Sequence, residues 1–83
     1  MKDFDFAVLV HNKDGNAFDS ETVEKCVINA VSKGEIDRLR VTPADGDDLR
    51  IEITGKAVDI PDFKVAINQE IKIVYPTAKL EYI

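Results

Sequence analysis

The sequence predicts an α+β fold in which strands and helices follow one another as β-α-β-β-α-β. Two segments have the apolar spacing of amphipathic helices, and each lies between segments with the patterns of strands. The two middle strands follow each other without a helix between them, joined by an acidic loop, which is typical of a hairpin. The chain has 83 residues, 45% hydrophobic and 33% charged. We therefore expect one domain, residues 1–83, around a thin core.

The first strand is expected at residues 4–11, FDFAVLVH. Its two alternating sets of side chains are both largely apolar, which suits a central strand of a sheet. The following residues, HNKDGNAF, carry turn signals, so the chain is expected to leave the sheet there.

The first helix is expected after Asp19, which has the side chain of an N-cap. Phe18, just before it, is expected to pack on Val23 one turn into the helix. Gly34 is expected to end the helix, because glycine adopts the left-handed conformation found there. The apolar stripe of this helix consists of Val23, Cys26, Val27, Ala30 and Val31.

The next two strands are expected at residues 38–41, RLRV, and 49–54, LRIEIT, with the loop TPADGDD between them. Strict alternation places their apolar side chains on one face of the hairpin and their polar side chains on the other. The polar face comprises Arg38, Arg40, Thr42, Arg50, Glu52 and Thr54.

The second helix is expected over residues 62–75, with Asp59 or Ile60 as its cap and Pro61 in its first turn. The alternative is a pair of strands, KVAIN and EIKIVY. The helix is preferred because Asn-Gln between them lacks the glycine that tight hairpin turns favour. The apolar stripe of this helix consists of Phe63, Ala66, Ile67, Ile71 and Val74. Glu70 falls within this stripe and is expected to reach solvent beside Lys79 or an arginine.

A short last strand, AKLEYI at residues 78–83, completes the order. Two right-handed β-α-β crossovers that interlock in this way give the ferredoxin-like sandwich, a four-stranded antiparallel sheet with both helices on one face. The first and third strands are then central, the second and fourth are edges, and the other face of the sheet is bare.

The cysteine and histidine content limits the disulfides, metal sites and catalytic groups that the chain can form. Cys26 and His11 are the only residues of their types, which excludes internal disulfides and the usual zinc sites. Cys26 is expected to pack in the core, away from His11, so a nucleophile–base dyad is not expected.

Residues 10–21 resemble a calcium loop, but Val10 stands where the first oxygen ligand is required. The acidic loop at residues 45–48 is expected to stay solvated. We therefore expect no enzymatic activity, no cofactor and no metal.

The net charge and the hydropathy of the chain disfavour nucleic acid and membranes as partners. The net charge of −5 disfavours general binding to nucleic acid, which relies on phosphate neutralisation. The apolar stretch FAVLV is too short for a signal sequence, and no apolar run approaches the ~18 residues of a membrane span. We expect a cytoplasmic protein without a membrane partner.

The arginine-bearing face of the hairpin is the predicted partner-binding surface, with Arg38, Arg40, Arg50 and Glu52 as its members. All three basic residues on these strands are arginine, which is enriched at protein interfaces. The sequence therefore predicts a small acidic non-enzymatic module that binds another protein, as an inhibitor or adaptor of the phage or mobile-element type.

Two alternatives remain open. The first is nucleic-acid binding through the same face, although LRIEIT lacks the aromatic residues on which RNA-binding domains of this topology stack bases. The second is a small-ligand regulatory domain of the ACT kind. Homodimerisation through an edge strand is a further possibility for its assembly.

Overall fold

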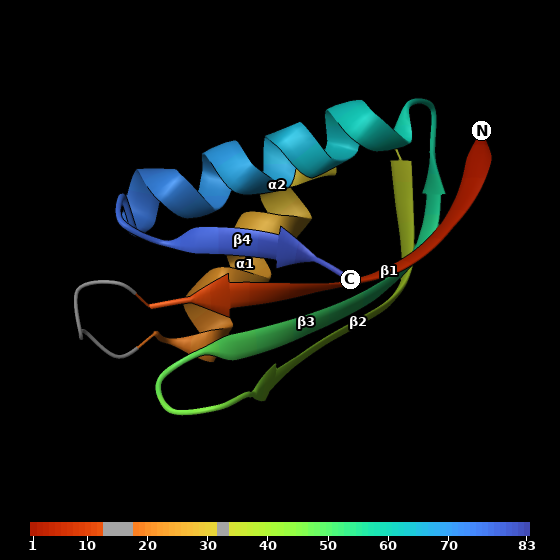
Figure 1. Ribbon diagram of the computed structural model, residues 1–83. Coiled ribbons are helices and arrows are strands. Elements are labelled where there is room, and N and C mark those ends of the chain that lie inside the picture. The colour runs from red at the N-terminus through yellow and green to blue at the C-terminus, as the bar shows by residue number, and fades with distance from the viewer. Residues whose placement is uncertain (13–17, 32–33) are drawn as a thin grey trace.

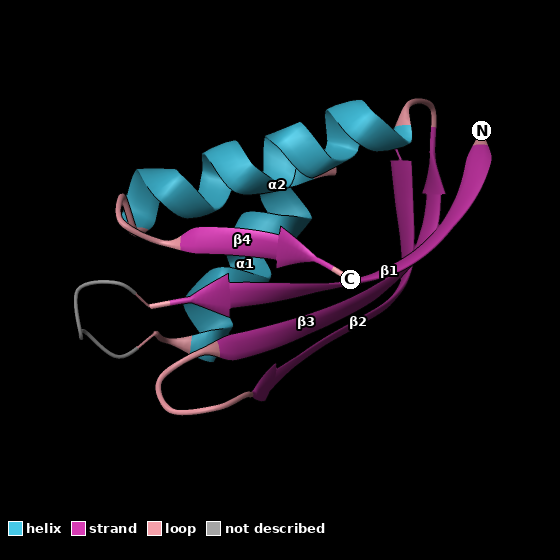
Figure 2. Cartoon of the chain, in the orientation of Figure 1, coloured by secondary structure: helices cyan, strands magenta, loops and turns pink. Residues whose placement is uncertain are grey.

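The computed structural model of the chain describes residues 1–12, 18–31 and 34–83 (Figure 1). The helices and strands follow one another in the predicted order β-α-β-β-α-β, and Figure 2 distinguishes them by colour. The elements are β1 (Lys2–His11), α1 (Ser20–Ala30), β2 (Gly34–Pro43), β3 (Leu49–Ala57), α2 (Ile60–Val74) and β4 (Lys79–Tyr82).

The strands form one four-stranded sheet in the order β2-β3-β1-β4. Each neighbouring pair is antiparallel, so β1 and β3 are central, and β2 and β4 form the edges. Both helices pack on the same face of this sheet (Figure 1). The predicted α+β fold of the ferredoxin-like arrangement is confirmed.

The strands are longer than their own sequence patterns predict. β1 begins at Lys2, opposite Ala57 at the end of β3, whereas the sequence pattern predicts that these strands begin at residue 4 and end at residue 54, respectively. β2 begins at Gly34, also opposite Ala57, and is paired with β3 as far as Pro43. These ends form because each strand finds a partner for its backbone N–H and C=O groups, a condition that the composition of one segment does not reveal.

The first helix begins as predicted and ends earlier. The Asp19 side chain accepts hydrogen bonds from the Glu21 backbone N–H (3.2 Å) and the Thr22 hydroxyl (2.8 Å). The helix ends at Ala30, and Gly34 is the first residue of β2, so the prediction that Gly34 stops the helix is wrong. Pairing of Gly34 with Ala57 places it in extended backbone.

The second helix is continuous from Ile60 to Val74, which excludes the alternative of two strands. Asp59 is its cap and accepts a hydrogen bond from the Asp62 backbone N–H at 3.0 Å, while Pro61 lies in the first turn. No helix in the described ranges is long and apolar enough to span a membrane.

The buried side chains form one cluster between the sheet and the two helices. Cys26 belongs to this cluster, with 5% of its surface exposed. Phe18 packs against the cluster, with its ring edge-on to Tyr75 at a centroid distance of 4.8 Å. The largest fully buried side chains are Val8, Val10, Val23, Val27, Ile51, Ile53, Ile67 and Ile71.

Candidate interaction surface

The predicted binding residues lie together on the face of the sheet that the helices leave open. Along β3, Leu49, Ile51 and Ile53 are buried toward the helices, so the residues between them point to the opposite face. Along β2, Leu39 packs against the core, which sends its two neighbours the other way. We call the resulting surface the arginine face; it consists of Arg38, Arg40, Arg50 and Glu52.

The register of β2 and β3 determines how the charges on the arginine face meet. Arg40 is directly opposite Glu52, and Arg38 is opposite the neutral Thr54. Glu52 accepts a hydrogen bond from Nε of Arg50, its neighbour along β3, at 3.2 Å. Neither Arg38 nor Arg40 forms an ion pair within the described residues. The arginine face therefore carries an excess of positive charge on a chain whose net charge is −5.

No aromatic side chain belongs to the arginine face. The four phenylalanines and two tyrosines of the chain all lie in the core or pack against it. Tyr82 is an example: its hydroxyl lies 2.9 Å from both the Lys64 carbonyl oxygen and Asn68 Oδ1, and burial raises its pKa well above the ordinary value. The arginine face thus lacks a platform on which bases could stack.

A shallow apolar groove lies on the helical side of the edge strand β2, between this strand and α1, so β2 separates it from the arginine face. Its volume is about 330 Å³, and it is lined by Glu24, Ile28, Val31, Ile36 and Leu39. Ile28 is 51% exposed there, although it is a large apolar residue. We call this feature the α1–β2 groove. Sequence reasoning missed it, and the only signal for it was an isoleucine outside the apolar stripe of the first helix.

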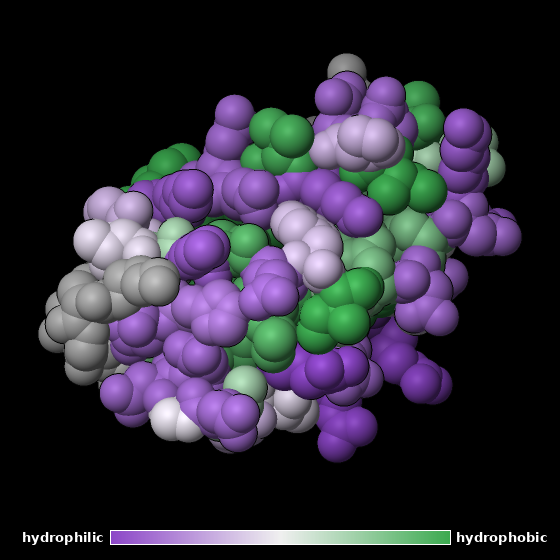
Figure 3. Space-filling model, in the orientation of Figure 1, coloured by the Kyte–Doolittle hydropathy of each residue, from purple (hydrophilic) through white to green (hydrophobic). Residues whose placement is uncertain are grey.

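Hydrophilic side chains cover much of the surface turned to the viewer in Figure 3, and hydrophobic patches interrupt them. Such a mixed surface is ordinary for a protein, since apolar atoms contribute more than half of most protein surfaces. The α1–β2 groove is distinguished by its place next to the outer edge of β2, an edge strand of the sheet, and not by apolar area alone.

His11 lies between two carboxylates at the end of β1. Its Nδ1 is 2.9 Å from Asp48 Oδ2, and its Nε2 is 3.0 Å from Glu81 Oε2. Asp48 Oδ1 also accepts a hydrogen bond from the Asn12 backbone N–H at 2.8 Å. The hydrogen bonds to Glu81 and Asp48 raise the pKa of His11. Sequence reasoning missed this cluster because the two carboxylates are 70 and 37 residues away along the chain.

The geometry separates His11 from Cys26. Val10 is buried toward the helices, so His11 points to the open face of the sheet, while Cys26 is buried on the helical side. Burial raises the pKa of the Cys26 thiol, and the nearby charge of Glu70 raises it further. As expected, the two residues do not form a dyad.

Glu70 is half-buried in α2, between solvent and the core. Within the parts of the chain that the structure describes it forms no ion pair, and Lys79, its expected neighbour, is paired opposite His11 in the sheet.

The described histidine, cysteine, aspartate and glutamate side chains contain no group of three placed to hold a metal ion. Residues 13–17 of the sequence that resembles a calcium loop lie outside the described residues.

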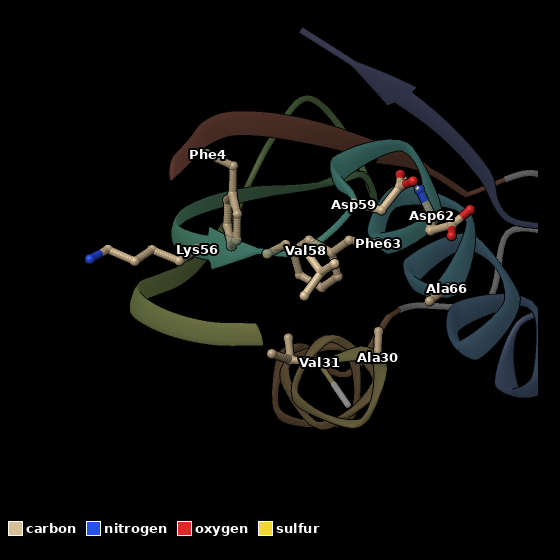
Figure 4. Close-up of a pocket in the computed structure, with 10 residues that line it drawn as sticks. Phe4, Ala30, Val31, Lys56, Val58, Asp59, Asp62, Phe63 and Ala66 are labelled. Atoms are coloured by element: carbon tan, nitrogen blue, oxygen red, sulfur yellow. Dashed lines mark hydrogen bonds between the residues drawn. The ribbon is translucent and has the colours of Figure 1, made fainter. Parts of the chain in front are cut away.

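A second hollow, of about 310 Å³, lies between the end of α1 and the start of α2 (Figure 4). Phe4, Val31 and Phe63 contribute apolar surface to it. Lys56 points away from the hollow in Figure 4, and the Asp59 carboxylate is engaged in capping α2. Asp62, the remaining charged residue of the lining, is exposed in the first turn of α2. The hollow therefore offers mainly apolar packing and lacks a set of convergent polar groups to orient a specific small ligand.

Comparison of the chain with protein-family models, with curated proteins and with solved structures finds no match. The function is therefore inferred from the geometry of the chain itself.

Proposed function

We propose that the protein is a small non-enzymatic interaction module that binds another protein through the arginine face, as an inhibitor or adaptor of the phage or mobile-element type. One observation carries this proposal: Arg38 and Arg40 are exposed, on the same side of an edge strand, and without an ion pair among the described residues. The lone buried thiol of Cys26 suits a reducing compartment, so we place the module in the cytoplasm.

The two arginines contribute little to the fold. Both side chains are exposed, and truncating them leaves the buried cluster intact. Surface substitutions of this kind usually change stability by less than about 0.5 kcal/mol. Arginine is instead valuable at interfaces, where its planar guanidinium binds a carboxylate through two hydrogen bonds at once. We therefore assign Arg38 and Arg40 to partner binding.

A protein partner fits better than nucleic acid. The arginine face has no aromatic side chain for base stacking, and the acidic chain repels a polyanion outside this patch. A protein partner needs only a few carboxylates to pair with the arginine face. Unlike a polyanion, the rest of its surface need not be repelled by the net negative charge of the chain. Nucleic-acid binding remains the second candidate, because phosphate groups also bind arginine pairs.

The test compares a double variant, Arg38→Ala with Arg40→Ala, with a charge-matched control, Lys25→Ala with Lys72→Ala. The control removes two exposed cations from α1 and α2 in place of two from β2. Each tagged protein is used to capture partners from cells of the native host, which are identified by mass spectrometry. Calorimetry with the purified partner then measures Kd. Thermal unfolding is followed for every variant.

We expect the arginine variant to stay folded and to bind its partner about tenfold more weakly or worse, since truncating an interface arginine often costs about 2 kcal/mol. The lysine control should bind as the parent does. A folded arginine variant with the parent's Kd would overturn the proposal. Capture that is abolished by nuclease, with affinity that falls steeply with salt, would favour nucleic acid instead.

A further inference from the structure

Among the described residues, the outer edge of β2 has no strand paired with it and offers a short stretch of regular backbone. β2 is hydrogen-bonded to β3 on one side and forms the edge of the sheet on the other. A register irregularity lies between Ile36 and Arg38, and Pro43 at the other end has no N–H to donate. Residues 38–42 lie between these interruptions and keep an uninterrupted register with β3. An added strand would pair with this segment.

The two sides of this edge differ in chemistry. Arg38 and Arg40 point to the open face of the sheet, and Leu39 between them lines the α1–β2 groove. In an added strand, residues opposite these three would alternate in the same way. The residues opposite the arginines would meet positive charge, and the residue between them would enter an apolar groove. Glu24 at the groove disfavours an acidic side chain on that side.

We infer that the partner presents an extended segment with the pattern acidic–apolar–acidic, which adds to the free edge of β2 as a fifth strand. This inference rests on the proposed function and names the chemistry of the partner. Backbone hydrogen bonds with residues 38–42 hold the segment, carboxylates bind Arg38 and Arg40, and the apolar side chain packs on Ile28 and Leu39. Asp37, which is exposed and lies at the irregularity next to Arg38, adds a negative charge at that end of the segment and disfavours a further acidic residue there.

A second copy of the chain is a poorer occupant of the same edge. Antiparallel pairing of β2 with itself places residues of the same face opposite one another. The register that pairs all of residues 38–42 with their counterparts is centred on Arg40 and brings Arg40 against itself, and the register centred on Leu39 brings Arg38 against Arg40. Like charges directly opposite each other destabilise a strand pair. The partner strand is therefore expected to differ from β2 in charge.

The test uses synthetic peptides long enough to pair with the whole of residues 38–42. The probe has Glu-Leu-Glu at its centre, flanked by threonines, and the two comparison peptides have Lys-Leu-Lys or Glu-Ser-Glu instead. Fluorescence anisotropy measures Kd for each peptide. We expect Glu-Leu-Glu to bind at least about tenfold more tightly than either comparison peptide. Lys-Leu-Lys lacks the carboxylates that would bind the arginines, and Glu-Ser-Glu lacks the apolar side chain that would enter the groove.

Variants of the chain then separate the two sides. Arg38→Ala with Arg40→Ala should weaken Glu-Leu-Glu binding about tenfold or more. Ile28→Gln should weaken it about fivefold, since it removes apolar surface from the groove without changing the charge. Val65→Gln is the matched control, because Val65 is also 51% exposed but lies on α2; it should bind the peptide as the parent does.

Amide hydrogen exchange reports whether the peptide forms a strand. Alternate N–H groups of an edge strand point away from the sheet, so binding should slow exchange at alternate residues of 38–42 and leave β4 unchanged. Peptide binding without this protection would overturn strand addition and leave the arginine face as the binding surface.

The remaining outcomes separate this inference from the proposed function. Equal binding of the Glu-Leu-Glu and Lys-Leu-Lys peptides would overturn the inferred partner chemistry. If the protein does not bind the peptide but still binds its native partner through Arg38 and Arg40, the inferred partner chemistry is overturned and the proposed function stands. If neither the peptide nor the native partner depends on Arg38 and Arg40, both the inference and the proposed function are overturned. A concentration-dependent dimer that protects β2, measured by analytical ultracentrifugation, would identify a second copy as the occupant and overturn the inference.

Discussion

Phe4 of β1 packs directly over Gly55 of β3. The two residues are opposite each other in the central strand pair, and both are buried. A Cβ atom on Gly55 would lie 2.9 Å from Cζ of Phe4 and would collide with the carbonyl oxygen of Glu35 on β2. Because Gly55 has no side chain, the Phe4 ring and the backbone of β2 at Glu35 can both lie close to the β3 backbone.

Gly55→Ala should therefore lower the free energy of unfolding by about 1–3 kcal/mol, because the added methyl group must displace backbone as well as a ring. Urea unfolding followed by circular dichroism measures the change. Gly46→Asn is the control: Gly46 has a φ of 62° with open space around it, and asparagine tolerates that conformation. Equal stability of Gly55→Ala and the parent would show that Phe4 and the start of β2 leave room for a methyl group at this position.

The carboxylates around His11 predict a pH-dependent contribution to stability. The pKa of His11 is raised in the folded chain above its ordinary value of 6.5, so the protonated ring stabilises the folded state. This contribution is fully present below pH 6.5 and is lost as the pH rises through the raised pKa. Lys79 is opposite His11 on β4, but the hydrogen bonds to the two carboxylates determine the direction of the shift.

The measurement is the free energy of unfolding of the parent and of His11→Gln across this pH range. The parent should lose stability relative to the variant as the pH rises from 6.5, and an NMR titration of the imidazole should report a pKa above 6.5. Parallel pH curves for the two proteins would contradict the prediction.

Cys26 is expected to be structural. Its thiol is buried and its pKa is raised, so little of the reactive thiolate forms at neutral pH. Native protein should react slowly with a thiol reagent, and the same protein in urea should react quickly. Cys26→Ala should lower the free energy of unfolding by about 1 kcal/mol, the order of a small core truncation, and should leave partner binding unchanged. Rapid modification of the native protein would refute this role.

The acidic loop at residues 45–48 is expected not to bind calcium at micromolar concentration. Both carboxylate oxygens of Asp48 are already engaged, by the Asn12 N–H and by His11, and a cation would have to displace these contacts. Calcium sites need about six to eight oxygen ligands, which this loop does not present. Calorimetry should show no stoichiometric site. Asp48→Asn is the matched variant, and a micromolar signal that this variant abolishes would overturn the expectation.

The order and type of the elements were determined by the sequence itself. The stripes on the two helices, the alternation in β2 and β3, and the caps Asp19 and Asp59 are local features. Each acts within a few residues, so each can be read from one segment. Alternation also sufficed to place Arg38, Arg40 and Arg50 on one face, because the side-chain period of a strand is two.

Only the tertiary structure decided where the strands end and which distant residues meet. Gly34 became part of β2 because Ala57 is available to pair with it. His11 met Asp48 and Glu81 because the register of β1 with β4 and the turn before β3 place them at one end of the sheet. Ile28 came to line a groove because α1 lies beside the edge strand. These features depend on contacts between segments far apart along the chain, and periodicity within one segment carries no information about them.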